Sequence, residues 1–182
     1  MMLRECIRLA REEQRVVVFL EPIALYPMRD LHEDKDGGWM TTYPERGRVI
    51  PLGEVGVDGD GTDLAIVTFA NGHYLSRRVA RRLVAAGHKV RVIDMRWLSP
   101  LPAEGLLAAV GDARRVLIVD ETRRSGGVAE ALMSLFTERT RLPVERLTAT
   151  DSFIATGPAY AATMPSEDGI YAAAQRMIGN AR

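Results

Sequence analysis

The pattern of hydrophobic and polar positions predicts a regular alternation of strands and helices from residue 63 onward. Apolar runs predict strands over residues 64–70, 90–95, 116–121 and 144–148. Helical spacing of apolar residues predicts helices over residues 74–87, 99–111, 127–139 and 166–178. Ser99 and Ser166 are the expected N-caps of two of these helices. Four strands, each followed by a helix, indicate an α/β fold of three layers, αβα, around a mostly parallel sheet with right-handed crossovers.

The opening residues form a separate unit in this pattern. Residues 2–14 predict a helix in which Leu3, Ile7 and Ala10 share an apolar stripe. The next run, VVVFLEP at residues 16–22, predicts a strand that Pro22 ends. The helical spacing is already present at the first residues, with no N-cap residue before them. We therefore expect the chain to be the C-terminal part of a longer protein. The alternative is an ordinary amphipathic N-terminal helix.

Residues 27–62 have no clear hydrophobic period and are rich in proline, glycine and aspartate. A structureless segment of that length is uncommon inside a compact domain. We therefore interpret it as an extended arm that links the opening unit to the main domain. Trp39, Met40 and Tyr43 give the arm apolar surface, so we expect it to pack on the domain.

Composition narrows the class of protein. The chain has 182 residues, of which 47% are hydrophobic and 26% charged, as in one globular domain. Its 24 basic and 24 acidic residues give no net charge, so nothing favours nucleic acid or an anionic membrane as a partner. The single cysteine, Cys6, excludes internal disulfides and cysteine-rich metal sites. No apolar run is long enough to span a bilayer, and the N-terminus is unlike a signal peptide, so we expect a cytoplasmic location.

The acidic turn at Asp58–Asp63 suggests two cofactor motifs, and neither fits. A calcium loop needs glycine at the position of Asp63 and an acid at that of Phe69. A thiamine diphosphate magnesium motif needs GDG followed by asparagine some 25–30 residues later, whereas the only asparagines are Asn71 and Asn180. We therefore expect an exposed turn before a strand.

Other candidate chemical groups lack partners in the sequence. Arg77, Arg78, Arg81 and Arg82 form a basic stripe at helical spacing, which favours a solvated face over a contact with phosphate or an acidic partner. The histidines are scattered, with no carboxylate spaced to form a dyad or a metal site, and no serine lies in a G-x-S-x-G elbow. The sequence thus predicts no catalytic, cofactor-binding or metal-binding residue.

The carboxyl ends of the predicted strands carry the remaining candidates, because ligands and partners of open α/β sheets usually lie there. Glycines at the start of the helix after strand 116–121 could present backbone N–H groups to an anion; the alternative is a tight strand-to-helix turn. The candidate interface or anion contacts are Asn71, His73, Glu121, Arg124, Gly126 and Gly127.

Four segments in order then resemble one family. They are VVVFLEPIALY, GDGTDLAIVTFANG, GHKVRVIDMRWLSPLP and RVLIVDETRRSGGVAEAL. Together they resemble the beta subunit of thiamine diphosphate-dependent 2-oxo acid dehydrogenases, the decarboxylating components of the pyruvate and branched-chain complexes. The resemblance runs from about Val16 to the C-terminal helix. It implies that residues 1–26 are a remnant of a pyrimidine-binding domain, 27–62 an interdomain linker and 63–182 a transketolase-type C-terminal domain.

The resemblance also implies what this chain does. Thiamine diphosphate and magnesium would be held in the parent by the missing pyrimidine- and diphosphate-binding domains or an alpha subunit, so no cofactor is bound by this fragment, which is inactive alone. The implied role is assembly: a homodimer through the C-terminal domain, and docking of the lipoyl acyltransferase's subunit-binding domain. Residues 137–144 carry Arg139 and Arg141 where relatives often include an acid.

Two alternatives stay open on the sequence. A transketolase or a deoxyxylulose-phosphate synthase shares this C-terminal domain, although VIDMRWLSPLP argues against transketolase. A standalone βα binding module would instead use the loop Asp120–Gly127 to hold an anion or a partner.

Overall fold

The computed structural model describes residues 1–179, and its centre is one five-stranded sheet. The strands are β1 (Gly56–Asp58), β2 (Leu64–Thr68), β3 (Val90–Asp94), β4 (Val116–Arg123) and β5 (Val144–Ala149). Their order across the sheet is β1-β3-β2-β4-β5; β1 is antiparallel to β3, and the other pairs are parallel. The predicted α/β class and mostly parallel sheet are confirmed.

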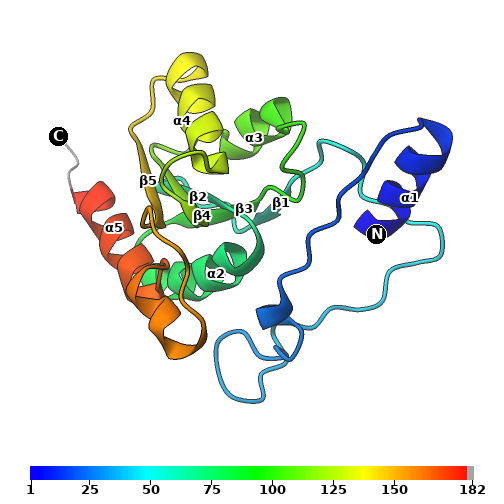
Figure 1. The fold of residues 1–182 in the computed structure, drawn as a ribbon. Coiled ribbons are helices and arrows are strands. Elements are labelled where there is room, and N and C mark those ends of the chain that lie inside the picture. Colours follow the sequence, from blue (N-terminus) through cyan, green and yellow to red (C-terminus); the bar gives the residue numbers. More distant parts are fainter. Residues whose placement is uncertain (180–182) are drawn as a thin grey trace.

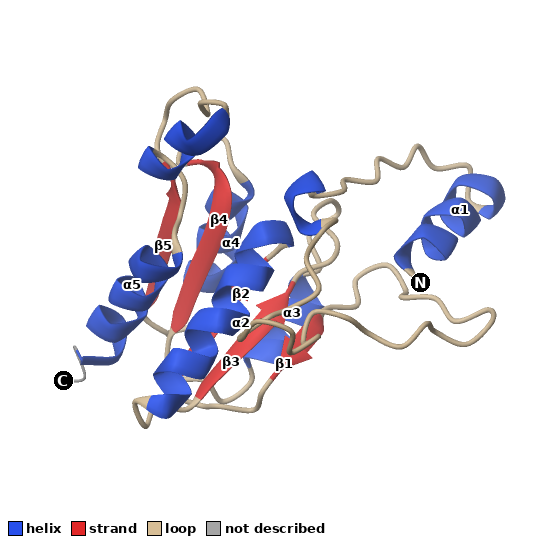
Figure 2. Ribbon diagram, turned by 90° about the horizontal axis from the view of Figure 1, so that it is seen from below, coloured by secondary structure: helices blue, strands red, loops and turns tan. Residues whose placement is uncertain are grey.

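Helices cover both faces of the sheet and give the predicted three layers (Figures 1 and 2). Helices α2 (Ala70–Ala85) and α5 (Glu167–Gly179) lie on one face, and α3 (Ala103–Val110) and α4 (Val128–Arg139) lie on the other. Every residue of β2 is buried, which explains its continuous apolar run. The fully buried large side chains that fill the two cores include Leu64, Leu83, Ile170, Leu106, Leu132 and Phe136.

Helix boundaries differ from the prediction at two places. Helix α2 begins at Ala70, four residues before the predicted start, because residues 70–73 contribute no apolar period to the pattern. Ser99 does not cap α3: the N-cap position is Pro102, and it makes no side-chain cap hydrogen bond. Ser166 does cap α5, since its Oγ accepts a 3.1 Å hydrogen bond from the backbone N–H of Gly169.

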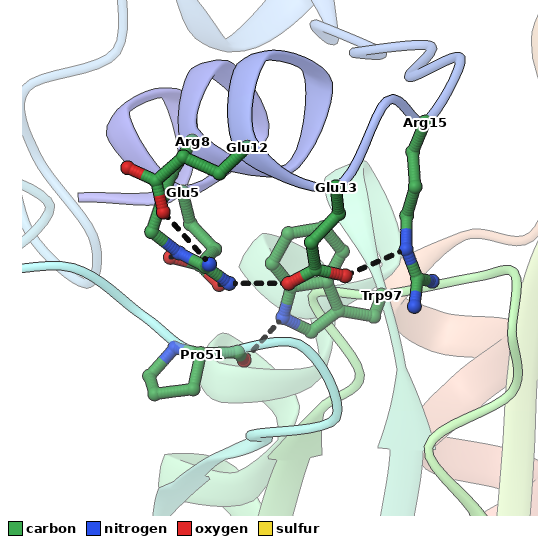
Figure 3. A network of polar contacts seen from close by, with 7 residues as sticks. All are labelled: Glu5, Arg8, Glu12, Glu13, Arg15, Pro51 and Trp97. Carbon is green, nitrogen blue, oxygen red and sulfur yellow. Dashed lines mark hydrogen bonds and ion pairs between the residues drawn. The ribbon is translucent and has the colours of Figure 1, made fainter.

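The opening helix packs on the domain through an unexpected face. In α1 (Met2–Glu12) the buried residues are Glu5, Cys6 and Leu9, whereas the predicted apolar stripe of Leu3, Ile7 and Ala10 is exposed. The reason is the partner: Cys6 and Leu9 pack with Trp97, which follows β3. Burial of Glu5 is compensated by an ion pair with Arg8 at 2.7 Å (Figure 3).

The predicted strand at residues 16–22 does not form. Within residues 1–179 the segment is extended with no neighbouring strand, and it leads to the short 3₁₀ helix Ile23–Leu25. The arm that follows contributes Gly56–Asp58, near its end, to the sheet as β1. Within residues 1–179, no helix has both the length and the apolar character required to cross a membrane.

The arm packs on α2 through part of the predicted apolar surface. Trp39 lies 5.7 Å from His73 and 5.1 Å from Tyr74, measured between ring centroids. By contrast, Met40 is 56% and Tyr43 83% exposed. Leu31 is buried, and the Tyr74 hydroxyl donates a 3.1 Å hydrogen bond to the Asp30 carbonyl oxygen, so residues 30–39 are held against α2.

Candidate functional site

The sheet order creates a topological switch point between β2 and β4. The chain leaves β2 through α2 on one face of the sheet to reach β3, and leaves β4 through α4 on the other face to reach β5. A crevice at such a point, outside the carboxyl ends of the strands, is the usual ligand site of open α/β sheets. Asn71 follows β2, and Glu121 lies in β4 just beyond Val119, the last residue of β4 that pairs with β2, so both lie at this position.

Asn71 and Glu121 form the polar pair of the switch point. Burial raises the pKa of the Glu121 carboxyl, and hydrogen bonds from the side chain and backbone of Asn71 partly oppose that rise. Ala70, immediately before Asn71, has a φ of +51°, which is uncommon for a residue other than glycine. A partly buried carboxyl of raised pKa beside a residue of positive φ makes Asn71 and Glu121 a candidate binding or contact site.

The turn from β4 to α4 is built around a buried carboxylate. Asp120 accepts hydrogen bonds from the backbone N–H groups of Thr122 at 2.7 Å and Ala129 at 2.8 Å. Gly127 is required here, because a Cβ at this position would lie 2.4 Å from the Thr122 Oγ1 atom and 2.6 Å from the Arg123 carbonyl oxygen. The hydrogen bonds that the Asp120 carboxylate accepts from these backbone N–H groups therefore stabilise the turn.

Two further carboxylates accept hydrogen bonds from backbone N–H groups farther along the same turn. Asp151 accepts a 2.8 Å hydrogen bond from the Ser125 backbone and a 2.6 Å bond from its hydroxyl, and these bonds lower the pKa of Asp151. Glu130 accepts a 3.1 Å bond from the Gly126 backbone. The backbone N–H groups of Ser125 and Gly126 are thus bonded within the chain, which favours a tight turn over an anion held by these two groups.

A surface hollow of about 590 Å³ lies between this turn and the segment after β5. Phe153 on its rim is 99% exposed. Nearby, the Arg146 guanidinium donates a 3.0 Å hydrogen bond to the Arg124 carbonyl oxygen, and Arg124 itself is exposed. The lining residues are Arg123, Ser125, Gly126, Asp151, Ser152 and Phe153.

His73 does not lie at the switch point with Asn71 but on the side of the sheet formed by β1 and β3. Its Nε2 atom lies 2.8 Å from the Asp58 carboxylate on β1, and its Nδ1 atom lies 3.9 Å from Asp94 on β3. The sequence analysis found no carboxylate spaced to form such a pair, and this was wrong, because Asp58 reaches His73 through the antiparallel pairing of β1 rather than by sequence proximity. The hydrogen bond lowers the pKa of Asp58. Together with Trp39, this cluster fastens the arm to α2.

The six sequence candidates thus divide into three groups. Asn71 and Glu121 are brought together at the switch point. Arg124, Gly126 and Gly127 belong to the β4–α4 turn. His73 lies at the β1–β3 side of the sheet. Sequence reasoning missed Asp58 and Asp151, because neither stands next to its partner in the chain.

The arginines of the basic stripe on α2 form ion pairs with acidic residues of the same chain. Arg78 pairs with Glu167 at 2.5 Å and also donates a 2.6 Å hydrogen bond to the Leu31 carbonyl oxygen. Arg82 pairs with Asp168 at 3.0 Å. The remaining pairs are Arg77 with Asp58 and Arg81 with Glu33. The stripe therefore ties α2 to α5 and to the arm, whereas a solvated face was expected.

Among residues 1–179, no group of three or more histidine, cysteine, aspartate or glutamate side chains is arranged to hold a metal ion. The Asp58–Asp63 turn has a structural role. Gly59 and Asp60 are exposed as predicted, but Gly61 is buried, and a Cβ there would lie 2.1 Å from the Val90 backbone nitrogen.

Comparison with known proteins places this fold in a family. The sequence profile described as "Transketolase, C-terminal domain" matches residues 53–170. Curated relatives include the pyruvate dehydrogenase E1 component subunit beta of Staphylococcus aureus (strain Mu50 / ATCC 700699) and of Bacillus subtilis (strain 168). Each is 28% identical over 166 residues, which cover 89% of this chain and 48% of the relative. The chain therefore spans about half the length of the curated relatives it matches.

Two solved structures share the fold. One is titled "Split gene transketolase, inactive beta4 tetramer", with a TM-score of 0.66 and 22% identity over 78% of this chain and 47% of that chain. The other is a 2-oxoglutarate:ferredoxin oxidoreductase from Magnetococcus marinus, with a TM-score of 0.53 and 18% identity over 69% of this chain and 20% of that chain. The resemblance to 2-oxo acid dehydrogenase beta subunits is confirmed by the curated relatives, and since the profile matches more than half of its length, the chain belongs to the transketolase C-terminal domain family.

Proposed function

We propose that this chain is the C-terminal assembly and docking domain of a thiamine diphosphate-dependent 2-oxo acid dehydrogenase, either a beta subunit or part of a fused chain. The observation that carries the proposal is the match to pyruvate dehydrogenase E1 beta subunits over 89% of the chain. The parent enzyme decarboxylates a 2-oxo acid and passes the acyl group to lipoyl. A cytoplasmic location and the division into residues 1–26, 27–62 and 63–182 are part of the same proposal.

The residues present do not fit thiamine diphosphate or its magnesium ion. The GDG sequence at Gly59–Gly61 is used to hold β3, because Arg91 donates hydrogen bonds to the carbonyl oxygens of Asp60 at 3.0 Å and Gly61 at 2.7 Å. Among the described residues, no acidic cluster could hold the metal. We therefore expect the chain alone to be inactive, with the cofactor held by other domains of the parent enzyme or by an alpha subunit.

The proposed docking surface is the rim formed by the β4–α4 turn and the exposed segment after β5. Arg123 and Arg124 supply positive charge there, and Phe153 and Ile154 supply exposed apolar surface. Such a combination suits a partner that is apolar and acidic, whether a second copy of this domain or the subunit-binding domain of the lipoyl acyltransferase. Arg139 is a weaker candidate, because it pairs with Glu104 at 3.1 Å.

The test combines an activity assay with a binding assay. The pure chain, supplied with thiamine diphosphate, magnesium and either pyruvate or branched 2-oxo acids, releases no carbon dioxide, whereas the whole parent enzyme does. Turnover by the pure chain would overturn the proposal. Titration calorimetry with a purified lipoyl acyltransferase subunit-binding domain gives saturable binding, which Arg124→Glu weakens and Arg139→Glu affects less.

Two further measurements separate the alternatives. An immunoblot of source cells gives a band well above 20.1 kDa; a band at 20.1 kDa would instead favour a standalone binding module. Turnover of sugar phosphates, rather than 2-oxo acids, by the whole enzyme would favour a transketolase or a deoxyxylulose-phosphate synthase.

A further inference from the structure

Residues 30–39 of the arm form a closed loop beside α2. The carboxylates of Asp30 and Asp36 accept hydrogen bonds from backbone N–H groups of the loop itself. The donors are Lys35 and Gly37 for Asp30, and Leu31, His32, Glu33 and Gly38 for Asp36. Within the loop only Leu31 is buried, so the attachment of the loop depends on a small number of contacts with α2.

Two arginines of α2 bond to the residues on either side of His32. Arg78 donates a 2.6 Å hydrogen bond to the Leu31 carbonyl oxygen, and Arg81 forms an ion pair with Glu33. His32 itself is partly buried. It therefore lies on the stretch of the loop that cationic side chains hold against α2.

The charges around His32 disfavour a proton on its imidazole. Burial, followed by the positive charges of three arginines on α2, lowers the pKa of His32. The three arginines are Arg81, Arg77 and Arg78. The Asp36 carboxylate of the loop acts in the opposite direction and offsets them only in part. A proton therefore binds His32 more readily when the loop is free than when it is docked on α2.

We propose that His32 makes the docking of residues 30–39 on α2 sensitive to pH: a proton on its imidazole adds positive charge beside the three arginines and releases the loop. Release begins as the pH falls below about 6.5, the ordinary pKa of histidine, and grows until the pH passes the lowered pKa of the docked state. Because α1 is held at Trp97 and β1 is held in the sheet, release frees the arm between these two points without unfolding the domain. The inference uses contacts within this chain and does not rest on the proposed function.

The other ionisable groups near the loop do not produce this transition. Hydrogen bonds lower the pKa values of Asp36 and Asp58, so both carboxylates stay charged throughout the pH range concerned. His73, which also contacts the arm, faces the carboxylates of Asp58 and Asp94. A proton on His73 therefore meets negative charge, whereas a proton on His32 meets positive charge.

The first experiment uses a lysine-specific endoprotease, because the chain has only two lysines, Lys35 in the loop and Lys89 before β3. The wild type is cut at Lys35 several-fold faster at about pH 5.5 than at about pH 7.5, after correction with a lysine peptide digested in the same tube. Cleavage at Lys89, which reports opening of the domain, stays slow at both pH values. Equal corrected rates at Lys35 would overturn the proposal.

Substitutions of the histidines identify the group that titrates. His32→Gln has no charge to gain, so Lys35 is cut slowly at both pH values. His32→Arg carries a permanent charge, so Lys35 is cut fast at both. The matched control, His88→Gln, lies outside the loop and keeps the response of the wild type. A response that survives His32→Gln but is lost in His73→Gln would assign the titration to His73 and overturn the proposal.

A second pair of variants separates charge from contact. Arg81→Gln and Glu33→Gln both remove the ion pair between these residues, so each raises the rate of cleavage at Lys35 near pH 7.5. Only Arg81→Gln also removes a positive charge that acts on His32, so only this variant shows a smaller ratio between the rates in acid and at neutral pH. Equal ratios in the two variants would show that the charge of Arg81 does not act on His32, and would contradict the proposed cause.

Proton NMR measures the titration of His32 directly. Its imidazole C–H signal is assigned by its absence from the spectrum of His32→Gln. The midpoint of that signal lies at a lower pH in the folded chain than in the chain unfolded in urea. A midpoint in the folded chain at or above that of the unfolded chain would overturn the proposal.

Discussion

The indole N–H of Trp97 donates a 2.8 Å hydrogen bond to the carbonyl oxygen of Pro51. This single contact joins the residue that follows β3 to the end of the arm, and the same indole ring forms the surface on which α1 packs (Figure 3). Trp97 is only 7% exposed. Trp97 therefore joins the opening helix, the arm and the C-terminal domain at one apolar cluster.

Trp97→Ala should detach α1 and destabilise the whole chain. Removal of a buried indole costs about 3–5 kcal/mol of unfolding free energy. Trp97→Phe keeps a smaller aromatic ring and removes the hydrogen bond to Pro51, and should cost less, about 1–2 kcal/mol. Urea unfolding followed by circular dichroism measures both, and hydrogen exchange of residues 2–12 reports the release of α1. Equal losses in the two variants would contradict packing as the larger contribution.

Glu5 should make the stability depend on pH. Its hydrogen bonds with Arg8 hold the pKa of the buried carboxyl below its ordinary value. An acid whose pKa is lowered by folding stabilises the protein above its ordinary pKa, and this contribution is lost as the pH falls through the folded-state value. Glu5→Gln should therefore be less stable than the wild type at pH 7, and the difference should shrink in acid. Urea midpoints between pH 3 and pH 7 test this, with exposed Glu12→Gln as the control.

Glu121 should have the opposite effect. Because burial raises the pKa of its carboxyl, the folded state binds a proton more readily than the unfolded state does. Its ionisation therefore opposes folding at pH values above the ordinary pKa of glutamate. Glu121→Gln should raise the urea midpoint at pH 7 and change it little in acid. A carboxyl that lowers stability is a candidate for functional use. A lower midpoint for the variant at pH 7 would contradict the sign.

Gly127 should tolerate no side chain. A Cβ at this position would overlap Thr122 and Arg123, so Gly127→Ala should cost about 1–3 kcal/mol through strain in the β4–α4 turn. The neighbouring Gly126 is the matched control: it has a φ of +72° and open space around it. Gly126→Asn should cost less than about 1 kcal/mol, because asparagine adopts that conformation more readily than other residues. Thermal unfolding of both variants gives the comparison, and a similar loss in each would exclude the steric cause.

Much of the fold could be predicted because the central strands are buried on both faces. The apolar runs of β2 and β4 and the helical spacing of α4 and α5 appear directly in the residue pattern. The boundary of α2 was missed because Ala70 continues the apolar run of β2 and the next three residues, Asn71–His73, show no helical apolar spacing. The face of α1 was missed because it depends on Trp97, which lies far away in the sequence.

The candidate site was less predictable than the fold. Asn71 and Glu121 could be placed at strand ends from the pattern, but their contact depends on β2 and β4 being neighbours, although β3 lies between them in the chain. The pairing of Asp151 with Ser125 likewise joins two strand ends that local sequence does not connect.

The sequence by itself determined the layers and the family, because hydrophobic period and motif order are local properties of the chain. Only the tertiary structure decided which polar groups meet: Asp58 with His73, Asp120 with Ala129, and Arg78 with Glu167. It also decided that residues 16–21 form no sheet within residues 1–179. A strand needs a partner for its backbone groups, and residue type alone does not supply one.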